Sequence, residues 1–162
     1  MKNLNQYVAV YKEQLQKGDI LIAYNELVKF VMNLRTDCIN QFTDVYSFTG
    51  ILHGYLDYTY FYFSNDFLKS KKLKLGIVLN HVEMRFEVWL LGNTKKVHQH
   101  YLNVLKDSQL NSTYLQLHPY AIVVIGIDNH PDFDNLPILS EKLQAQIKLQ
   151  SETIIAAVKA VS

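Results

Sequence analysis

The stretch KLKLGIVLNHVEMRFEVWLLG, from Lys72 to Gly92, decides the fold of this chain. Apolar residues recur at every second position on both sides of Asn80 and His81, a period that is typical of β-strands with one buried face. We predict a hairpin in which Asn80 and His81 form a two-residue loop. The residues expected on the inner face are Leu73, Leu75, Ile77 and Leu79 in the first strand and Val82, Met84, Phe86, Val88 and Leu90 in the second.

The loop length of the hairpin determines which side chains lie opposite one another. A two-residue loop places Leu79 opposite Val82, so both apolar sets reach the same face of the hairpin. The same register places Lys74 opposite Glu87 on the other face, where a cross-strand ion pair is expected. The hairpin therefore predicts an antiparallel sheet with one apolar face and one mostly polar face.

The segments around the hairpin complete an α+β domain. Their order of α, α, β, β, β, α, β, α predicts a single domain over residues 1–162, with an antiparallel sheet of four or five strands and helices packed on the sheet. The second helix is expected to be mostly buried, because only a narrow stripe of it is polar. The expected segments are helices at about Leu4–Leu15 and Ile20–Phe42, a strand over Thr49–Phe63 with Gly54 as a candidate bulge, a helix at about Lys95–Lys106, a short strand at Tyr114–Leu117, a buried strand over Ala121–Ile127 and a helix over about Pro137–Val161.

Composition places the chain among ordinary globular proteins. It has 162 residues, of which 49% are hydrophobic and 19% charged, so it can bury a core without disulfides or metal. A net charge of +1 provides no field that favours nucleic acid, and the longest apolar run, Ala121–Ile127, is too short to span a bilayer. Cys38 has no partner cysteine, and the first residues, MKNLNQYVAVY, lack an apolar leader segment. We therefore expect a soluble cytoplasmic protein.

The main candidate site consists of polar side chains on the expected polar side of the sheet. His53 and Asp57 are four residues apart in the first strand, and Arg85 and Glu87 share one face of the third. If these strands meet, the side chains would supply a general base, an acid and an anion-binding guanidinium, with Trp89 as a wall. The alternative is a face held by cross-strand ion pairs that carries no chemistry. No catalytic residue is assigned among them.

Glu87 is the residue of this group that the pattern constrains most. Its carboxylate must leave the core on the polar side of the hairpin. If another element covers that side, the charge needs a partner, and the register offers Lys74, Arg85 or His53.

The order of helix, three antiparallel strands, helix and strand resembles the core of the restriction-endonuclease-like superfamily. That resemblance implies an Asp on the second core strand and a Glu-x-Lys on the third. Here Leu73–Leu79 contains no Asp, and Trp89 stands where the Lys is expected. The resemblance therefore implies a degenerate domain that lacks the metal-binding residues rather than an active nuclease.

Residue spacing predicts no metal site and no cofactor. His98 and His100 are two residues apart in an expected helix, so they lie on different faces. The loop from Asp128 to Asp134 resembles the start of a calcium-binding loop, but its sixth position is Phe133 and its twelfth is Leu139. We interpret this loop as an ordinary acidic turn.

Two blocks of sequence, GYLDYTYF over Gly54–Phe61 and NHVEMRFEVWLLGN over Asn80–Asn93, resemble a bacterial family of small proteins that is described only as a domain of unknown function. The resemblance implies a free-standing bacterial domain. It implies no activity, substrate or catalytic residue.

These observations favour a non-catalytic domain that binds a small ligand or another protein, including a second copy of itself in a homodimer. The reason is that the sequence contains no complete catalytic set, although it has eleven Tyr and eight Phe. The alternative is an enzyme that acts on a small anionic substrate through His53, Asp57, Arg85 and Glu87. Neither nucleic acid nor a membrane is expected as a partner.

Overall fold

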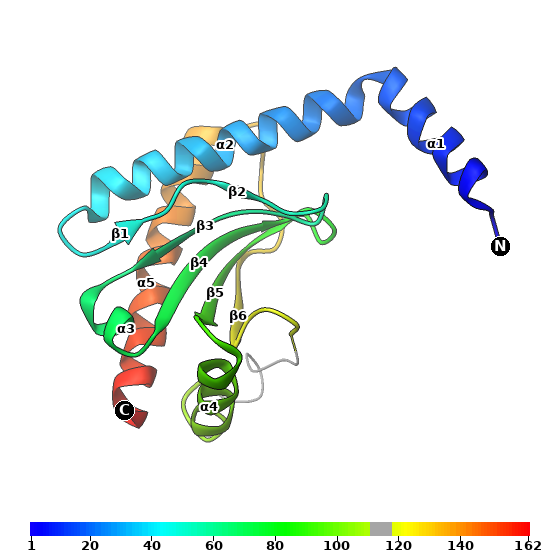
Figure 1. Cartoon of the computed structure of the whole chain (residues 1–162). Helices are drawn as coiled ribbons and strands as arrows, with labels where there is room; N and C mark the ends of the chain where they lie inside the picture. The colour runs from blue at the N-terminus through cyan, green and yellow to red at the C-terminus, as the bar shows by residue number, and fades with distance from the viewer. Residues whose placement is uncertain (111–117) are drawn as a thin grey trace.

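A computed structural model describes residues 1–110 and 118–162 of the chain. Figure 1 shows a twisted sheet with α2 lying across it and α5 packed behind it. This arrangement confirms the α+β class, with helices packed on an antiparallel sheet. The elements are α1 Leu4–Lys17, α2 Asp19–Phe42, β1 Ser47–Phe48, β2 Leu52–His53, β3 Tyr58–Ser64, α3 Asp66–Ser70, β4 Leu73–Asn80, β5 Arg85–Gly92, α4 Lys95–Leu105, β6 Val123–Asp128 and α5 Leu136–Val161. The strand expected at Tyr114–Leu117 lies outside the described residues.

Among the described residues, six strands form the sheet in the order β1-β3-β4-β5-β6, with β2 also paired to β3, and each pair is antiparallel. The expected continuous strand over Thr49–Phe63 is wrong, because this segment folds back on itself. Asp57 Oδ1 accepts hydrogen bonds from the backbone N–H groups of Tyr55 and Tyr58, both at 2.8 Å, and closes a turn. A Cβ at Gly54 would collide with this carboxylate, so Gly54 marks the turn rather than a bulge.

The core lies between the sheet and the helices α2 and α5. We call this side of the sheet the core face and the opposite side the outer face. Phe86 on β5 has no solvent exposure and meets the Phe30 ring of α2 edge to face, with ring centroids 5.7 Å apart. The last helix, which the sequence places at about Pro137–Val161, buries one side against the sheet; its buried residues include Leu139, Leu143, Ile147, Ile154 and Val158.

The β4–β5 hairpin is confirmed, but its expected register is wrong. Leu79 lies opposite Phe86 instead of Val82, so the turn contains four residues, 81–84, rather than two. Asn80 Oδ1 closes this turn by accepting hydrogen bonds from the backbone N–H groups of Val82 and Glu83, both at 3.1 Å. Met84 completes the turn with a φ of +48°.

The difference from the expected register is four residues. Because four is an even number, Phe86 and Val88 still lie on the core face. Val82 and Met84, which were expected to face inward, are exposed in the turn instead. Lys74 lies opposite Leu91, so the expected pair between Lys74 and Glu87 does not form.

Replacing Phe86 by Ala is expected to lower the free energy of unfolding by about 3–5 kcal/mol, because it leaves a cavity between β5 and the helices. Equilibrium denaturation in urea measures this loss. Val82→Ala, in the exposed turn of the same hairpin, serves as the control and should change stability by less than about 0.5 kcal/mol. A loss for Phe86→Ala as small as that of the control would contradict the described core.

Candidate functional site

The outer face of the sheet, expected to be polar, is largely aromatic. Trp89, expected as the wall of a pocket, is only 4% exposed, so it is part of a second apolar cluster. The edge of the Tyr58 ring contacts it with centroids 5.0 Å apart, and the His118 ring does so at 4.6 Å. The buried members of this cluster are Val78, Trp89, Leu91 and Ala121, and the partly buried ones are Tyr58, Tyr60, Tyr62 and Val124.

Glu87 lies within this face and is 1% exposed. One carboxylate oxygen accepts from Arg85 Nε at 2.5 Å and from Asn80 Nδ2 at 3.3 Å. The other accepts from Trp89 Nε1 at 2.7 Å. Of the three partners expected from the sequence, Arg85 is therefore the one that pairs with Glu87 and neutralises its charge. Together with Asn80 and Trp89, it gives both carboxylate oxygens a hydrogen bond.

The structure brings Arg85, Glu87 and Trp89 together and places His53 and Asp57 elsewhere. His53 pairs across the sheet with Thr59, a buried residue of the core face, so His53 lies on the side opposite Glu87. The Asp57 carboxylate accepts backbone hydrogen bonds within its own turn. The Glu87 carboxylate therefore has hydrogen bonds at both oxygens, and the Asp57 carboxylate closes its turn through Oδ1, so each stabilises the local fold.

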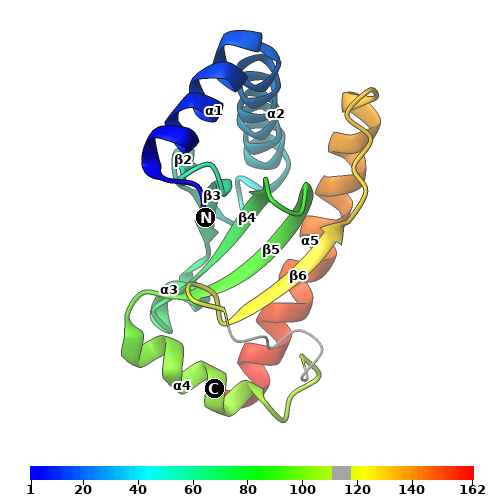
Figure 2. The same ribbon diagram turned by 90° about the vertical axis from the view of Figure 1, so that its right-hand side faces the viewer.

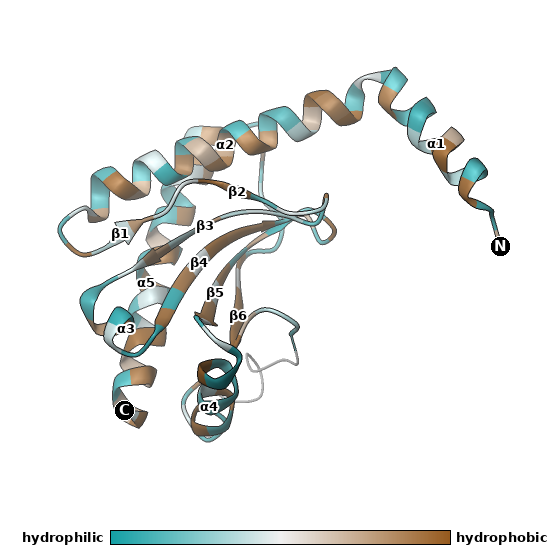
Figure 3. Ribbon diagram, viewed as in Figure 1, coloured by the Kyte–Doolittle hydropathy of each residue, from teal (hydrophilic) through white to brown (hydrophobic). Residues whose placement is uncertain are grey.

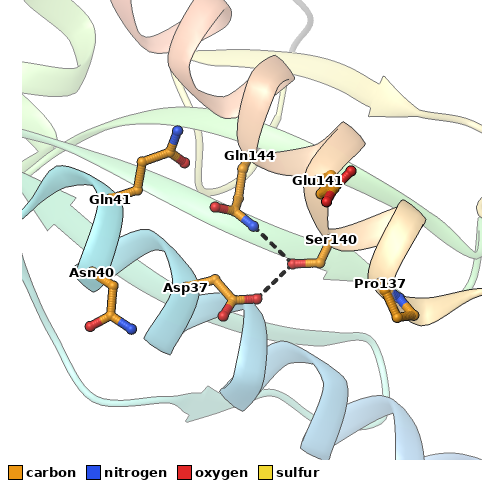
Figure 4. A pocket seen from close by; sticks show the side chains of 7 residues that line it. All are labelled: Asp37, Asn40, Gln41, Pro137, Ser140, Glu141 and Gln144. Carbon is orange, nitrogen blue, oxygen red and sulfur yellow. Dashed lines mark hydrogen bonds between the residues drawn. The ribbon is translucent and has the colours of Figure 1, made fainter.

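A polar hollow between α2 and α5 was not indicated by the sequence (Figure 4). Ser140 Oγ donates to Asp37 Oδ2 at 2.7 Å and accepts from Gln144 Nε2 at 3.1 Å. None of the described residues that line the hollow is a histidine, so Ser140 lacks the base that usually activates a serine nucleophile. We interpret these contacts as a link that holds α5 against α2.

The N-terminal helix leaves the body of the protein, and none of its residues is buried (Figure 1). Gly18, with a φ of +86°, ends α1 and lets the chain turn into α2. Figure 3 shows apolar residues on α1 and at the start of α2, beyond the end of the sheet. Six of the exposed apolar side chains of this region form what we call the arm surface; they are Leu4 (76% exposed), Tyr7 (55%), Val8 (52%), Tyr11 (59%), Ile20 (49%) and Leu21 (48%). Val10 and Ile22 are also exposed in this region.

The expectation that the second helix is mostly buried is wrong for its first half, which contributes Ile20 and Leu21 to the arm surface. The buried residues of α2 begin only at Phe30, because the N-terminal half of the helix extends past the sheet. The Tyr24 ring stacks on His81 in the β4–β5 turn, with ring centroids 5.4 Å apart. This contact joins α2 to the β4–β5 turn. We call this turn and the neighbouring β2–β3 turn the hairpin ends; their exposed apolar residues include Tyr55, Leu56 and Val82.

Within residues 1–110 and 118–162, no group of three or more His, Cys, Asp or Glu side chains is placed to hold a metal ion. None of the helices described there combines the length and the apolar character needed to cross a bilayer.

Glu87→Gln is expected to lower the free energy of unfolding by about 1–3 kcal/mol, because an amide nitrogen must then face a donor from Arg85, Asn80 or Trp89. Denaturation monitored by Trp89 fluorescence measures this loss. Glu83→Gln removes a charge from the exposed turn of the same hairpin and should be nearly neutral. Equal stability of the two variants would contradict a structural role for Glu87.

One family model matches the chain over residues 4–158, and its description is Domain of unknown function (DUF7000). The comparisons found no similar curated protein and no similar solved structure. The match includes all of α1, the β4–β5 hairpin and nearly all of α5, so the arm surface lies within the domain that defines the family. The chain belongs to the DUF7000 family, a domain of unknown function.

Proposed function

We propose that this chain is a non-catalytic protein-interaction domain that forms a homodimer through the arm surface. The observation that carries the proposal is the apolar stripe of α1, a helix in which no residue is buried. Leu4, Tyr7, Val8 and Tyr11 follow the spacing of a single helix face. A face of this kind is usually buried against another element.

The length of α1 supports the need for a partner. The helix has 14 residues, and isolated helices shorter than about 12–15 residues are marginally stable in water. The capping box of Asn3 and Gln6 helps to start the helix but leaves its apolar face in water. A second protein surface over this face would stabilise α1 and remove the apolar side chains from water.

The area of the exposed surface fits a protein interface. Side chains of this size with about half of their surface exposed contribute roughly 100 Å² each, so the six of the arm surface offer about 600 Å². A stable interface buries about 800 Å² on each partner. The dimer interface that we propose therefore also covers the three exposed residues at the hairpin ends, which bring the area to about 900 Å².

The distribution of charge favours a second copy as the partner. Glu13 and Lys17 lie on the other side of α1 and pair with each other at 2.9 Å, so the apolar stripe itself carries no charge. In a twofold dimer, the same patch meets itself, and an uncharged apolar patch can do so without like-charge repulsion. We propose that the arm surfaces of two copies pack against each other in this way.

The contacts of Glu87 support the non-catalytic part of the proposal, because its carboxylate accepts hydrogen bonds from Arg85, Asn80 and Trp89.

We also propose that the protein is bacterial and cytoplasmic, as expected from the sequence. Cys38 is buried, and burial together with the charge of Asp37 raises the pKa of its thiol to about 12, which suits an unreactive core thiol in a reducing compartment.

Light scattering coupled to size exclusion tests the dimer. The wild-type chain is expected to elute as a dimer at concentrations of about 100 µM, whereas Tyr7→Glu should raise the dissociation constant at least about tenfold by placing a charge in the interface. Asn5→Glu introduces the same charge on the polar side of α1 and should leave the dissociation constant within about twofold. A wild-type monomer, or equal effects of the two variants, would refute the proposal.

A further inference from the structure

A groove of 660 Å³ lies between the outer face of the sheet and the first turns of α4. Tyr62 and Lys74 line it from the sheet, Lys95 and His98 from α4, and the segment 118–120 from a third side. Figure 2 shows α4 at the end of the sheet where β5 finishes. The groove borders the outer-face cluster through Tyr62 and Leu91, but neither Glu87 nor its partners Asn80, Arg85 and Trp89 line it. Its volume is within the range of about 300–1,000 Å³ found for small-molecule sites.

The lining of the groove carries basic groups without a balancing acid. Its titratable basic residues are Lys74, Lys95, His98 and His118, and none of the described lining residues is Asp or Glu. Residues 111–117, NSTYLQL, contain no acid in their sequence either. Because the whole chain has 15 acidic residues for 16 Lys and Arg, this local excess is a property of the groove and not of the composition.

Lys74 is a partly desolvated cation without a carboxylate partner. Burial lowers the pKa of its ammonium group, which lies 4.1 Å from the centroid of the Tyr62 ring. The ion pairs of the described residues do not include Lys74. An anion in the groove would compensate the hydration that this ammonium group has lost.

The start of α4 adds positive potential to the same groove. Thr94 caps the helix by accepting from the Val97 N–H at 3.2 Å, and the first turn then carries Lys95 and Lys96 with no acidic residue. Helix N-termini favour acidic groups, so two lysines at this position are locally unfavourable. A bound anion would offset this unfavourable arrangement.

The position of this helix start is fixed by its neighbours. A Cβ at Gly92 would lie 2.7 Å from the backbone nitrogen of His98, so glycine lets β5 end directly against the first turn of α4. On the third side, His118 Nδ1 accepts from the backbone N–H groups of Tyr120 at 3.1 Å and Ala121 at 3.0 Å. The proton of a neutral His118 is therefore on Nε2, which leaves a hydrogen-bond donor on this ring.

We infer that the groove binds a small organic anion. Lys74, Lys95 and the N-terminus of α4 would hold a phosphate or carboxylate group, and Leu91, Leu102 and Tyr120 would contact an apolar or aromatic body. The volume exceeds what a bare phosphate or carboxylate fills, so the ligand has an organic part. This site is independent of the arm surface, because no residue of α1 or α2 lines the groove.

Titration of the ¹⁵N-labelled full chain tests the site, with pyrophosphate and citrate as probes and sodium chloride at matched ionic strength as reference. Saturable shifts of the backbone amides from Thr94 to His98 are expected with at least one probe, and the tighter probe identifies phosphate or carboxylate as the preferred group. Lys95→Gln should weaken binding about tenfold, because it removes a charge that contacts the anion. Lys74→Gln should do the same.

Lys106→Gln is the matched control, since it removes an exposed lysine from the other end of α4. It should leave the dissociation constant within about twofold. If neither probe gives saturable shifts, or if Lys95→Gln and Lys106→Gln weaken binding equally, the groove is not an anion site. If the Tyr7→Glu variant binds the anion probe with the wild-type affinity, anion binding does not depend on the dimer, and the two proposals are tested separately.

Discussion

The pairing of β4 with β5 is the interaction on which the rest of the structure depends. Its register places Phe86 and Val88 under α2 and α5, so the hydrophobic core forms on one side of the hairpin. The same register directs Glu87 and Trp89 to the outer face. β3 and β6 then pair on the two sides of this hairpin and extend both faces. Both the core and the outer-face cluster are therefore consequences of one alignment of two strands.

Burial of Glu87 is the main energetic cost of that alignment. A carboxylate out of water is tolerated only when its charge and its hydrogen-bonding capacity are matched. Arg85, Asn80 and Trp89 meet both requirements, and each comes from the same hairpin. Glu87, a candidate site residue in the sequence, thus acts as the polar centre of an aromatic face.

The sequence predicts the hairpin, the α+β class and the core position of Phe86, because strand alternation is a local signal with a strict period of two. It does not predict the four-residue turn, which depends on Asn80 accepting from two backbone groups and on Met84 adopting a positive φ. The sequence also does not predict the break in the expected first strand. The turn that Asp57 closes there lies within an alternating pattern that looks like one continuous strand.

Features that depend on contacts between distant segments cannot be predicted from the periodicity of the sequence. The exposure of the first half of α2 is set by where the sheet ends, and the burial of Trp89 is completed by His118 and Ala121 from a distant segment. The basic groove combines Lys74, Lys95 and His118 from three separate parts of the chain. No spacing in the sequence relates these three residues.

We propose that a second copy of the chain holds α1 in place. Hydrogen exchange of the α1 amides, measured over a series of protein concentrations, tests this most directly. We expect the protection of α1 to rise with protein concentration, while the protection of β4 and β5 stays constant. Protection of α1 that does not change with concentration, whether high or low, would contradict it.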